Sequence, residues 1–352
     1  MKALIFAAGL GTRLKPITDT LPKALVPVSG QPLLWHVIEK LKRAGITDFV
    51  INVHHFADKI RDYVAANNSF GVNIAFSDET DLLRETGGGI RHAAPLLGGT
   101  SPLDSAPMLG VSPLLNGTSP LDSAPQQLGA DSGQSQLTAA DSGSLQPGAV
   151  QSGCQSLAAE PFLVHNVDIL SNLDIEQFIA KHMETSDSAP EYHTLACQTP
   201  AHHTLATLLV SDRQTQRYLL FNQEDLMVGW MNIQTGQVKS PYPHLRREPA
   251  AVGAASSAAS SAVHSNASTS AFDWQVFLQE HSLKKYAFDG AHIISPEIFG
   301  LMEGMPEKFS IIDFYLGICH KYNIRYHIQP NLEMIDVGKL DSLQKAEEFL
   351  LA

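Results

Sequence analysis

The sequence predicts an α/β fold with a parallel sheet, because strand and helix patterns alternate along its first 97 residues. Residues 2–7 are a short apolar run that ends near two glycines, as expected of a strand buried on both faces. Strands at residues 48–53 and 72–76 follow, separated by helices at 31–44 and 57–66. This alternation implies a parallel sheet with right-handed crossovers.

The helix expected at residues 31–44 has a clear period. Leu34, Val37, Ile38 and Leu41 recur at helical spacing, and Gly45 follows them as a C-terminal cap would. The same alternation resumes later in the chain. Further strands are expected at residues 161–167, 206–210, 286–294 and 324–329, and further helices at 175–182, 311–322 and 340–351.

Two low-complexity tracts interrupt this pattern. Only 17% of the 352 residues are charged, against a usual ~25%, and the deficit lies largely at residues 98–160 and 250–271. In the first tract, Gly99-Thr-Ser-Pro-Leu-Asp-Ser-Ala-Pro107 recurs verbatim at residues 117–125, but such units lack the aliphatic face that stacked repeats bury. We expect a disordered insertion at 98–160, an Ala/Ser-rich loop insertion at 250–271 and one domain over residues 1–352.

Charge and cysteine content exclude several classes of protein. The net charge of −12 argues against nucleic-acid binding. Up to Leu97, however, eleven Lys and Arg stand against nine Asp and Glu, a balance that would attract a small anionic substrate. Three cysteines give no disulfide framework and no CxxC site. No run approaches the ~18 apolar residues of a membrane span, so we expect a soluble, cytoplasmic protein that binds no membrane.

The most specific motif follows the first strand. It reads Ala7-Ala8-Gly9-Leu10-Gly11-Thr12-Arg13, continues through Pro16 and Thr18, and ends in Pro22-Lys23. Glycines let backbone N–H groups surround phosphate oxygens, and Arg13 and Lys23 supply neutralising charge. A dinucleotide fingerprint is excluded because Leu14 takes the third glycine position, and a P-loop is excluded because no Gly-Lys-Ser/Thr follows.

The whole pattern resembles the signature of the sugar nucleotidyltransferases, or nucleoside-diphosphate-sugar pyrophosphorylases. Other matching segments are Val26-Pro-Val28, Gly30-Gln-Pro-Leu33, Glu85-Thr-Gly-Gly-Gly-Ile90, His165-Asn-Val-Asp168, Phe288-Asp-Gly-Ala291 and Ile335-Asp-Val-Gly338. The end-to-end pattern is most similar to the short bacterial N-acetylmuramate 1-phosphate uridylyltransferase-like members, which also lack the Glu-Lys-Pro element of many relatives.

The resemblance implies a Rossmann-like three-layer sandwich with a mostly parallel mixed sheet, of the nucleotide-diphospho-sugar transferase type. It also implies Mg²⁺-dependent transfer of a nucleotidyl group from a nucleoside triphosphate (NTP) to a sugar 1-phosphate, with release of pyrophosphate. The implied residues are Arg13 and Lys23 for catalysis, Ala8, Gly9, Gly11, Thr12, Glu85, Thr86 and Gly87 for the nucleotide, Asn166, Asp289 and Gly290 for the sugar, and Asp168 and Asp336 for Mg²⁺. Two carboxylates leave Mg²⁺ room for waters and substrate phosphates.

The sequence departs from the family pattern at three positions beside the implied metal ligands. Val167 replaces the Gly of Asn-Gly-Asp, and in the second motif Met334 replaces a Trp while Ile335 replaces the usual Val. Two segments also have a simpler interpretation, because the glycines at residues 87–89 and the Phe288-Asp-Gly-Ala291 segment are each typical of a tight turn. Trp230 could stack on a base or a sugar, although packing is its commoner role.

Several functions remain open at this point. We expect UTP with N-acetylmuramate 1-phosphate or a related hexose 1-phosphate, and GTP with mannose 1-phosphate is the alternative within the class. An alternative of another class is a catalytically silent regulatory or binding homologue, which would be free to lose Arg13, Lys23 or a metal carboxylate. The fifteen histidines show no metal-binding spacing, and the oligomeric state is not indicated.

Overall fold

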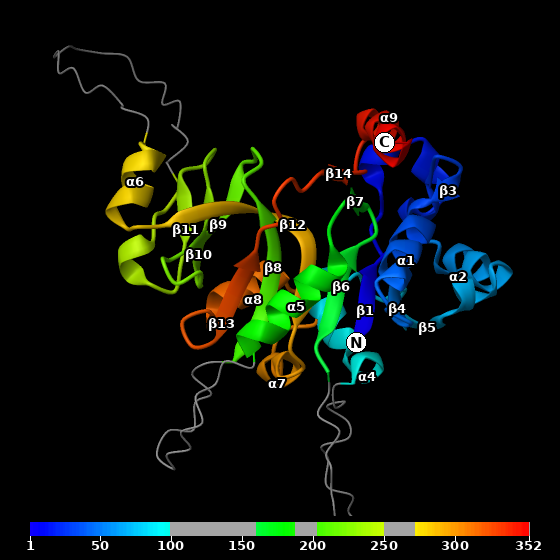
Figure 1. Ribbon diagram of the computed structural model, residues 1–352, viewed down its shortest axis with the longest axis horizontal. Coiled ribbons are helices and arrows are strands. Elements are labelled where there is room, and N and C mark those ends of the chain that lie inside the picture. The colour runs from blue at the N-terminus through cyan, green and yellow to red at the C-terminus, as the bar shows by residue number, and fades with distance from the viewer. Residues whose placement is uncertain (99–159, 187–202, 250–271, 352) are drawn as a thin grey trace, which may run out of the picture. The chain divides into compact units, whose positions relative to one another are not determined.

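The structure is a computed structural model that describes residues 1–98, 160–186, 203–249 and 272–351, all of which lie in one compact unit. The two low-complexity tracts lie outside the described residues, apart from residues 98 and 160 at the ends of the first. The ribbon is shown in Figure 1. No helix in the described ranges is long and apolar enough to cross a membrane.

The alternation expected in the first hundred residues is confirmed. The elements are β1 (Lys2–Phe6), α1 (Leu33–Arg43), β4 (Asp48–Val53), α2 (Ala57–Ala66) and β5 (Asn73–Asp78). Strand β1 pairs with β4 in parallel, and β4 pairs with β5 in parallel. Gly45 ends the α1 segment with a φ of 82° and donates its N–H to the carbonyl of Lys42, as its place in the sequence predicts.

Short elements and the second half of the chain complete the fold. Between β1 and α1 lie the 3₁₀ helices η1 (Thr12–Leu14), η2 (Ile17–Asp19) and η3 (Lys23–Leu25) and the strands β2 (Pro27–Val28) and β3 (Gln31–Pro32). The later elements are η4 (Asn68–Gly71), α3 (Glu85–His92), α4 (Ala94–Leu97), β6 (Phe162–Asn166), β7 (Ile169–Ser171), α5 (Ile175–Ser186), β8 (Thr204–Ser211), β9 (Arg217–Phe221), β10 (Met227–Asn232), β11 (Gln237–Lys239), η5 (Pro243–Leu245), α6 (Trp274–Glu280), β12 (Lys284–Ile294), α7 (Ile298–Leu301), α8 (Ile311–Ile318), β13 (Asn323–His327), β14 (Met334–Asp336) and α9 (Leu340–Leu351).

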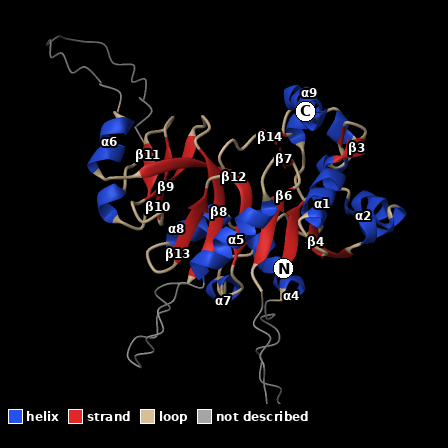
Figure 2. Ribbon diagram, in the orientation of Figure 1, coloured by secondary structure: helices blue, strands red, loops and turns tan. Residues whose placement is uncertain are grey.

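In the described part of the chain, one ten-stranded sheet forms the centre of the fold. Its strands run in the order β11-β10-β9-β12-β6-β1-β4-β5, with β8 on β12 and β13 on β8. Figure 1 labels these strands, and Figure 2 shows the strands in red. The pairs among β5, β4, β1 and β6 are parallel, whereas β12 runs antiparallel to β6, β8 and β9. The mixed, mainly parallel sheet is therefore confirmed.

Strand β12 joins two parts of this sheet. Its first residues, Lys284 to Tyr286, pair with β9, and its last residues pair with β6 and β8. The register on β8 shifts between Phe288 and His292, where Gly290 has a φ of 76°. The segment Phe288-Asp-Gly-Ala291 is therefore a bulge inside a continuous strand, and the interpretation as a turn between strands is wrong.

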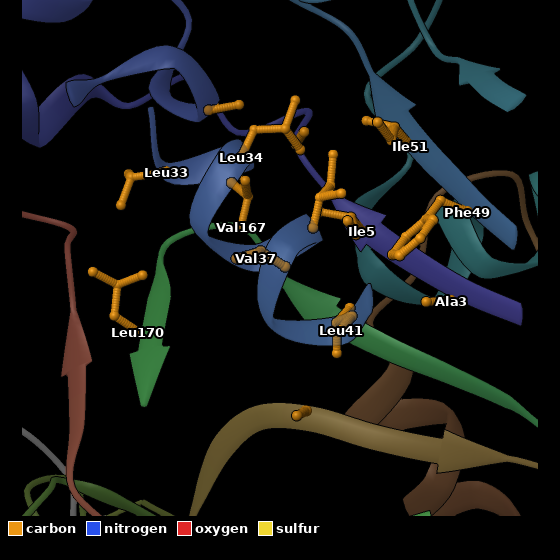
Figure 3. Close-up of a cluster of buried hydrophobic side chains, with 14 of the residues drawn as sticks. Ala3, Ile5, Leu33, Leu34, Val37, Leu41, Phe49, Ile51, Val167 and Leu170 are labelled. Carbon is orange, nitrogen blue, oxygen red and sulfur yellow. The ribbon is translucent and has the colours of Figure 1, made fainter. Parts of the chain in front are cut away.

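Helices cover both faces of the sheet. Alternate residues of β1 point to opposite faces, so Ile5 packs in one buried cluster with α1 while Leu4 packs in another with α3 and α8. Figure 3 shows the first cluster, in which Leu34 and Val37 of α1 lie beside Ile5. A third buried cluster joins β9, β10 and β11 to α6. The two clusters around β1 give the three layers that the sequence predicts.

The glycine-rich segment at residues 85–90 is helical, so the turn expected there is wrong. It forms most of α3, and Gly87 and Gly88 lie against the segment before α8. The N–H groups of both glycines donate to the carbonyl of Phe309, at 2.9 and 3.2 Å. A Cβ atom at either position would overlap this segment, which explains glycine inside a helix despite its low helix propensity.

A methyl group at Gly88 should therefore destabilise the fold. The added Cβ of Gly88→Ala would meet the backbone carbonyl of Glu307, and such overpacking costs about 1–3 kcal/mol of unfolding free energy. Gly317→Ala in α8 is the matched control, because no heavy atom lies within 4 Å of its added Cβ and alanine favours a helix by up to ~1 kcal/mol. Urea unfolding of both variants tests this, and equal stability of the two would contradict the packing argument.

Candidate functional site

The candidate site lies where three parallel strands end. The pairing of β1 with β4 and β6 sets Asn52, Phe6 and Asn166 side by side at the last positions of the ladder. Carboxyl ends of neighbouring parallel strands are where open α/β sheets bind ligands. The loops that follow Phe6 and Asn166 therefore start from one edge of the sheet.

The loop after β1 presents free backbone donors. Its start is fixed by Asn52, whose carbonyl accepts from the N–H of Ala7 and whose Oδ1 accepts from the N–H of Ala8, both at 3.2 Å. Gly11 has a φ of 63°, and a Cβ there would lie 2.8 Å from Cγ2 of Thr18, so glycine is required. Within the described residues, the N–H groups of residues 9–13 make no hydrogen bond. They are available to an anion.

A lysine and an aspartate meet beside this loop. Lys23 begins η3 and is 8% exposed, and its ammonium contacts Oδ2 of Asp168. Asp168 follows Val167, whose N–H donates to the carbonyl of Phe6 at 3.1 Å. Two residues predicted from separate motifs are thus in direct contact, although they are 145 positions apart.

The second predicted metal ligand reaches the same edge through the last strand. Strand β14 pairs with β7, which sets Asp336 opposite Ile169, and the N–H of Val337 donates to the carbonyl of Asp168 at 2.8 Å. A Cβ at Gly338 would lie 2.7 Å from Oδ1 of Asp336 and 2.9 Å from Nη2 of Arg13. The side chains of Arg13 and Asp336 therefore share the space above Gly338.

A pocket of about 250 Å³ opens between the loop and the strand ends. Seven of the predicted residues line it: Ala8, Gly9, Lys23, Glu85, Thr86, Asn166 and Asp168. Seven others do not: Gly11, Thr12, Arg13, Gly87, Asp289, Gly290 and Asp336. Of these, Gly87 directs its N–H to Phe309, so that N–H cannot hydrogen-bond a base.

Asp289 and Gly290 lie beneath the pocket rather than in it. The side chain of Asp289 is fully buried, and its Oδ1 accepts from Nε of Arg213 at 2.7 Å. Burial raises the pKa of this carboxyl, and the hydrogen bond from Arg213 opposes that effect. A Cβ at Gly290 would lie 2.7 Å from Nδ2 of Asn166. Strand β12 thus supports Asn166, the residue of this set that lines the pocket.

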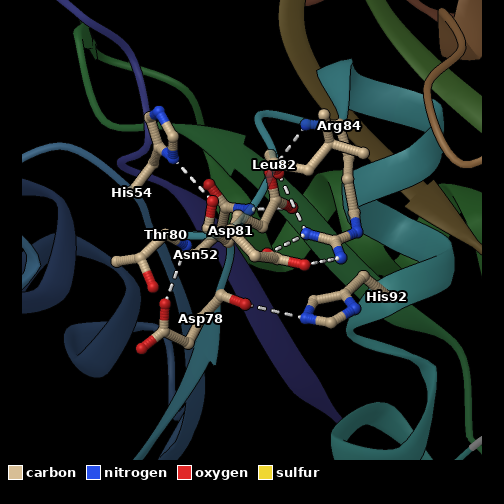
Figure 4. Close-up of polar contacts among 9 residues, drawn as sticks. Asn52, His54, Asp78, Thr80, Asp81, Leu82, Arg84 and His92 are labelled. Atoms are coloured by element: carbon tan, nitrogen blue, oxygen red, sulfur yellow. Dashed lines mark hydrogen bonds and ion pairs between the residues drawn. The ribbon is translucent and has the colours of Figure 1, made fainter.

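Asn52 and Glu79 line the pocket but were not predicted from the sequence. Nδ2 of Asn52 donates to Oε1 of Glu79 at 2.5 Å, and the N–H of Arg84 donates to Oε2 at 3.1 Å. Figure 4 shows these contacts around Asn52 and Arg84. A polar residue inside an otherwise apolar strand was the available signal for Asn52. Glu79 had none, because its burial arises from the packing of α3 against the sheet.

Among the described residues, no three His, Cys, Asp or Glu side chains gather as a metal cluster. The donor set at this edge is the carboxylate pair of Asp168 and Asp336, with the ammonium of Lys23 on one oxygen of Asp168. The two carboxylates, of which Asp168 contacts a cation, lie at the same sheet edge as free N–H groups for phosphates, and this set would fit a hard divalent ion that keeps several of its ligands for substrate and water.

Comparison with known proteins agrees with this arrangement. A family model described as nucleotidyl transferase matches residues 2–109. Residues 2–109 are thus similar in sequence to the nucleotidyl transferase family. The chain is 50% identical to the N-acetylmuramate alpha-1-phosphate uridylyltransferase of Neisseria meningitidis over 100 residues. The matched segment covers 28% of this chain and 43% of that protein. Over 98 residues the chain is 41% identical to a mannose-1-phosphate guanyltransferase of Gibberella zeae, covering 28% and 27% of the two chains.

These matches span less than half the length of each relative. A likeness over the whole chain comes from the structure of a UDP-glucose pyrophosphorylase bound to UDP-glucose. Its TM-score is 0.53 at 14% sequence identity, with coverage of 99% of this chain and 98% of the other. At that identity the likeness shows the fold alone, a Rossmann-like mixed sheet with helices, as expected from the sequence.

Val167, which stands where the family pattern has glycine, is among the residues that line the pocket of about 250 Å³. It is 4% exposed and belongs to the buried cluster beneath the sheet edge, where Figure 3 shows it near Val37. The core therefore accommodates the branched side chain that replaces the family glycine. Trp230 is partly buried, packs against the second cluster and lines a separate pocket.

Stability should fall with rising pH because of Glu79. Burial raises the pKa of this carboxyl above its ordinary value of 4.5, so the folded state favours the neutral form. Its contribution to stability is complete below pH 4.5 and is lost as pH rises through the raised pKa. Glu79→Gln should therefore gain stability relative to the unsubstituted protein between pH 4 and pH 8. Urea unfolding across this range measures the gain. The exposed Glu280→Gln is the control, and a pH-independent difference for Glu79→Gln would contradict the expectation.

Proposed function

We propose that this protein is an Mg²⁺-dependent enzyme that transfers a nucleotidyl group from an NTP to a sugar 1-phosphate. The observation that carries the proposal is the meeting of five free N–H groups, Lys23 and two carboxylates at one sheet edge. This set matches a triphosphate whose charge must be held and neutralised. We propose UTP and N-acetylmuramate 1-phosphate, or a related hexose 1-phosphate, as substrates.

The reaction needs no covalent nucleophile from the protein. An oxygen of the sugar phosphate attacks the α-phosphorus, the bond from that phosphorus to the bridging β-phosphate oxygen breaks, and pyrophosphate leaves. The loop of residues 9–13 would hold the triphosphate, Lys23 would contact the α-phosphate, and Arg13 would neutralise the departing pyrophosphate. Mg²⁺ held by Asp168 and Asp336 would supply further neutralisation when bound.

The second candidate is transfer from GTP to mannose 1-phosphate, which the likeness to a mannose-1-phosphate guanyltransferase supports. A catalytically silent homologue is less well supported, because Arg13, Lys23, Asp168 and Asp336 are all present at one edge.

Pyrophosphate release tests these alternatives. The full chain is assayed with Mg²⁺, each of the four NTPs, and a panel of sugar 1-phosphates that includes N-acetylmuramate, N-acetylglucosamine, glucose and mannose 1-phosphate. We expect release with UTP and an N-acetylated hexose 1-phosphate. Release with GTP and mannose 1-phosphate would select the second candidate, and no release with any pair would favour the silent homologue.

A further inference from the structure

A second pocket, of about 490 Å³, lies beside the first and carries an excess of positive charge. We call it the basic pocket and define it by Arg213, Arg217, Trp230, Lys239, Phe288 and Asp313, which line it together with neighbouring residues of β9 and α8. Three of its lining residues are cations and Asp313 is its one carboxylate. None of the site residues that the family resemblance implies lines it, whereas Trp230, considered from the sequence for stacking on a base or a sugar, does.

Two short connections join the basic pocket to the pocket of about 250 Å³ between the loop and the strand ends, which we call the nucleotide pocket. On β12, Phe288 lines the basic pocket and Gly290, two positions later, packs on Asn166 of the nucleotide pocket. At the start of α8, the N–H of Ile311 donates to Oγ1 of Thr86 at 3.1 Å. Thr86 lines the nucleotide pocket, whereas the neighbours of Ile311 line the basic one. A substrate held by its phosphate in the first pocket therefore has the second within reach.

Two of the three cations already have a carboxylate partner. Arg213 donates from Nε to Asp289 at 2.7 Å and from Nη2 to the carbonyl of Phe288 at 3.0 Å. Lys239 contacts Oδ1 of Asp313 at 2.9 Å, and its ammonium lies 5.3 Å from the ring centroid of Trp230.

Arg217 is the exception. Its side chain is exposed at the start of β9, and within the described residues it makes no ion pair or hydrogen bond. Its strand neighbour Leu219 pairs with Trp230 of β10. A guanidinium presents a planar fork of donors that matches a carboxylate, and an indole ring packs against the apolar face of a sugar. The pocket thus offers an unpaired cation together with the indole ring of Trp230.

We propose that the basic pocket binds the sugar of a carboxylate-bearing sugar 1-phosphate and that Arg217 selects the carboxylate. This proposal rests on the proposed function for the identity of the reacting phosphate. Arg213 acts as a positioning residue, since its bonds to Asp289 and Phe288 fix the wall of the pocket. Arg217 determines specificity by pairing with the substrate's second anionic group.

Calorimetric titration of the full chain with matched sugar phosphates tests the proposal. Glucuronate 1-phosphate differs from glucose 1-phosphate by a carboxylate, and N-acetylmuramate 1-phosphate differs from N-acetylglucosamine 1-phosphate by a lactyl ether that carries one. We expect at least one carboxylated member to bind about 10-fold or more tightly than its neutral partner. Arg217→Gln should remove this preference, and Arg217→Lys should keep part of it.

Lys285→Gln is the matched control. Lys285 lies 4.1 Å from the ring centroid of Tyr218 in the same sheet, but it lines a different cavity. This variant should keep the preference for the carboxylated sugar. Equal binding of both members of each pair, or an equal loss for both in Arg217→Gln, would overturn the proposal. Preference for glucose 1,6-bisphosphate over both carboxylated sugars would overturn the choice of a carboxylate.

Measuring turnover as well as binding distinguishes a failure of this proposal from a failure of the proposed function. If carboxylated sugars bind through Arg217 but no NTP yields pyrophosphate with them, the proposed function fails and the binding proposal stands. If pyrophosphate is released equally well with neutral and carboxylated sugars, and the binding affinities are also equal, the proposed function stands and the role of Arg217 is refuted.

Discussion

Replacing Lys23 with glutamine should lower kcat by about 10²-fold or more, because a positioned charge that stabilises the transition state is typically worth that much. Lys23 is buried at the pocket and contacts Asp168, so in the proposed mechanism its ammonium would lie between the α-phosphate and this carboxylate. Steady-state release of pyrophosphate measures kcat and KM separately. A loss of transition-state stabilisation appears in kcat, whereas a loss of uniform binding would appear in KM alone.

Lys15→Gln is the control for this substitution. Lys15 lies in the same loop, but it is 60% exposed and pairs with exposed Asp19 at 3.0 Å, and such surface ion pairs contribute little. Its kcat should match that of the unsubstituted protein. A Lys23→Gln enzyme with undiminished kcat would remove Lys23 from the proposed mechanism.

Replacing Asp168 with asparagine should weaken the binding of Mg²⁺ and lower the activity by about 10²-fold or more. The neutral amide keeps the shape of the side chain but removes one of two carboxylates at the sheet edge, and it also leaves the ammonium of Lys23 unpaired. Titration of activity with Mg²⁺ should show a much higher half-saturating concentration.

Asp19→Asn serves as the matched control for Asp168→Asn, because Asp19 is half exposed and pairs only with Lys15 among the described residues. Thermal unfolding of each variant shows whether a loss of activity reflects a loss of fold. An Asp168→Asn protein that keeps the original Mg²⁺ dependence would place the metal elsewhere.

The parallel half of the fold was predictable because its signals are local. Runs such as Asp48–Val53 and the period of α1 mark elements whose ends the structure confirms to within a few residues. The sequence assigned Lys23 and Asp168 to one site from two separate motifs, and the structure places the two side chains in contact, which was not itself predicted. In these cases the local sequence pattern favours the same structure that the tertiary contacts stabilise.

Other features depend on contacts between distant segments. The glycines of α3 suggest a turn when considered alone, and they form a helix because Phe309 packs against them. The strands β9, β10 and β11 gave no prediction, because their short apolar runs lack a distinctive period. Glu79 could not be identified either, since its buried position depends on the placement of Asn52 and Arg84.

The pairing of β14 with β7 has a consequence for how the site comes into being. Residues 2–109, which match the family model, contain the loop of residues 9–13 and Lys23. Asp336 lies in β14, in the last part of the chain. During synthesis, the loop of residues 9–13 and Lys23 are therefore made long before Asp336. The proposed metal site therefore requires both halves of the polypeptide to fold together, and cleavage of the chain that releases β14 should abolish the proposed activity.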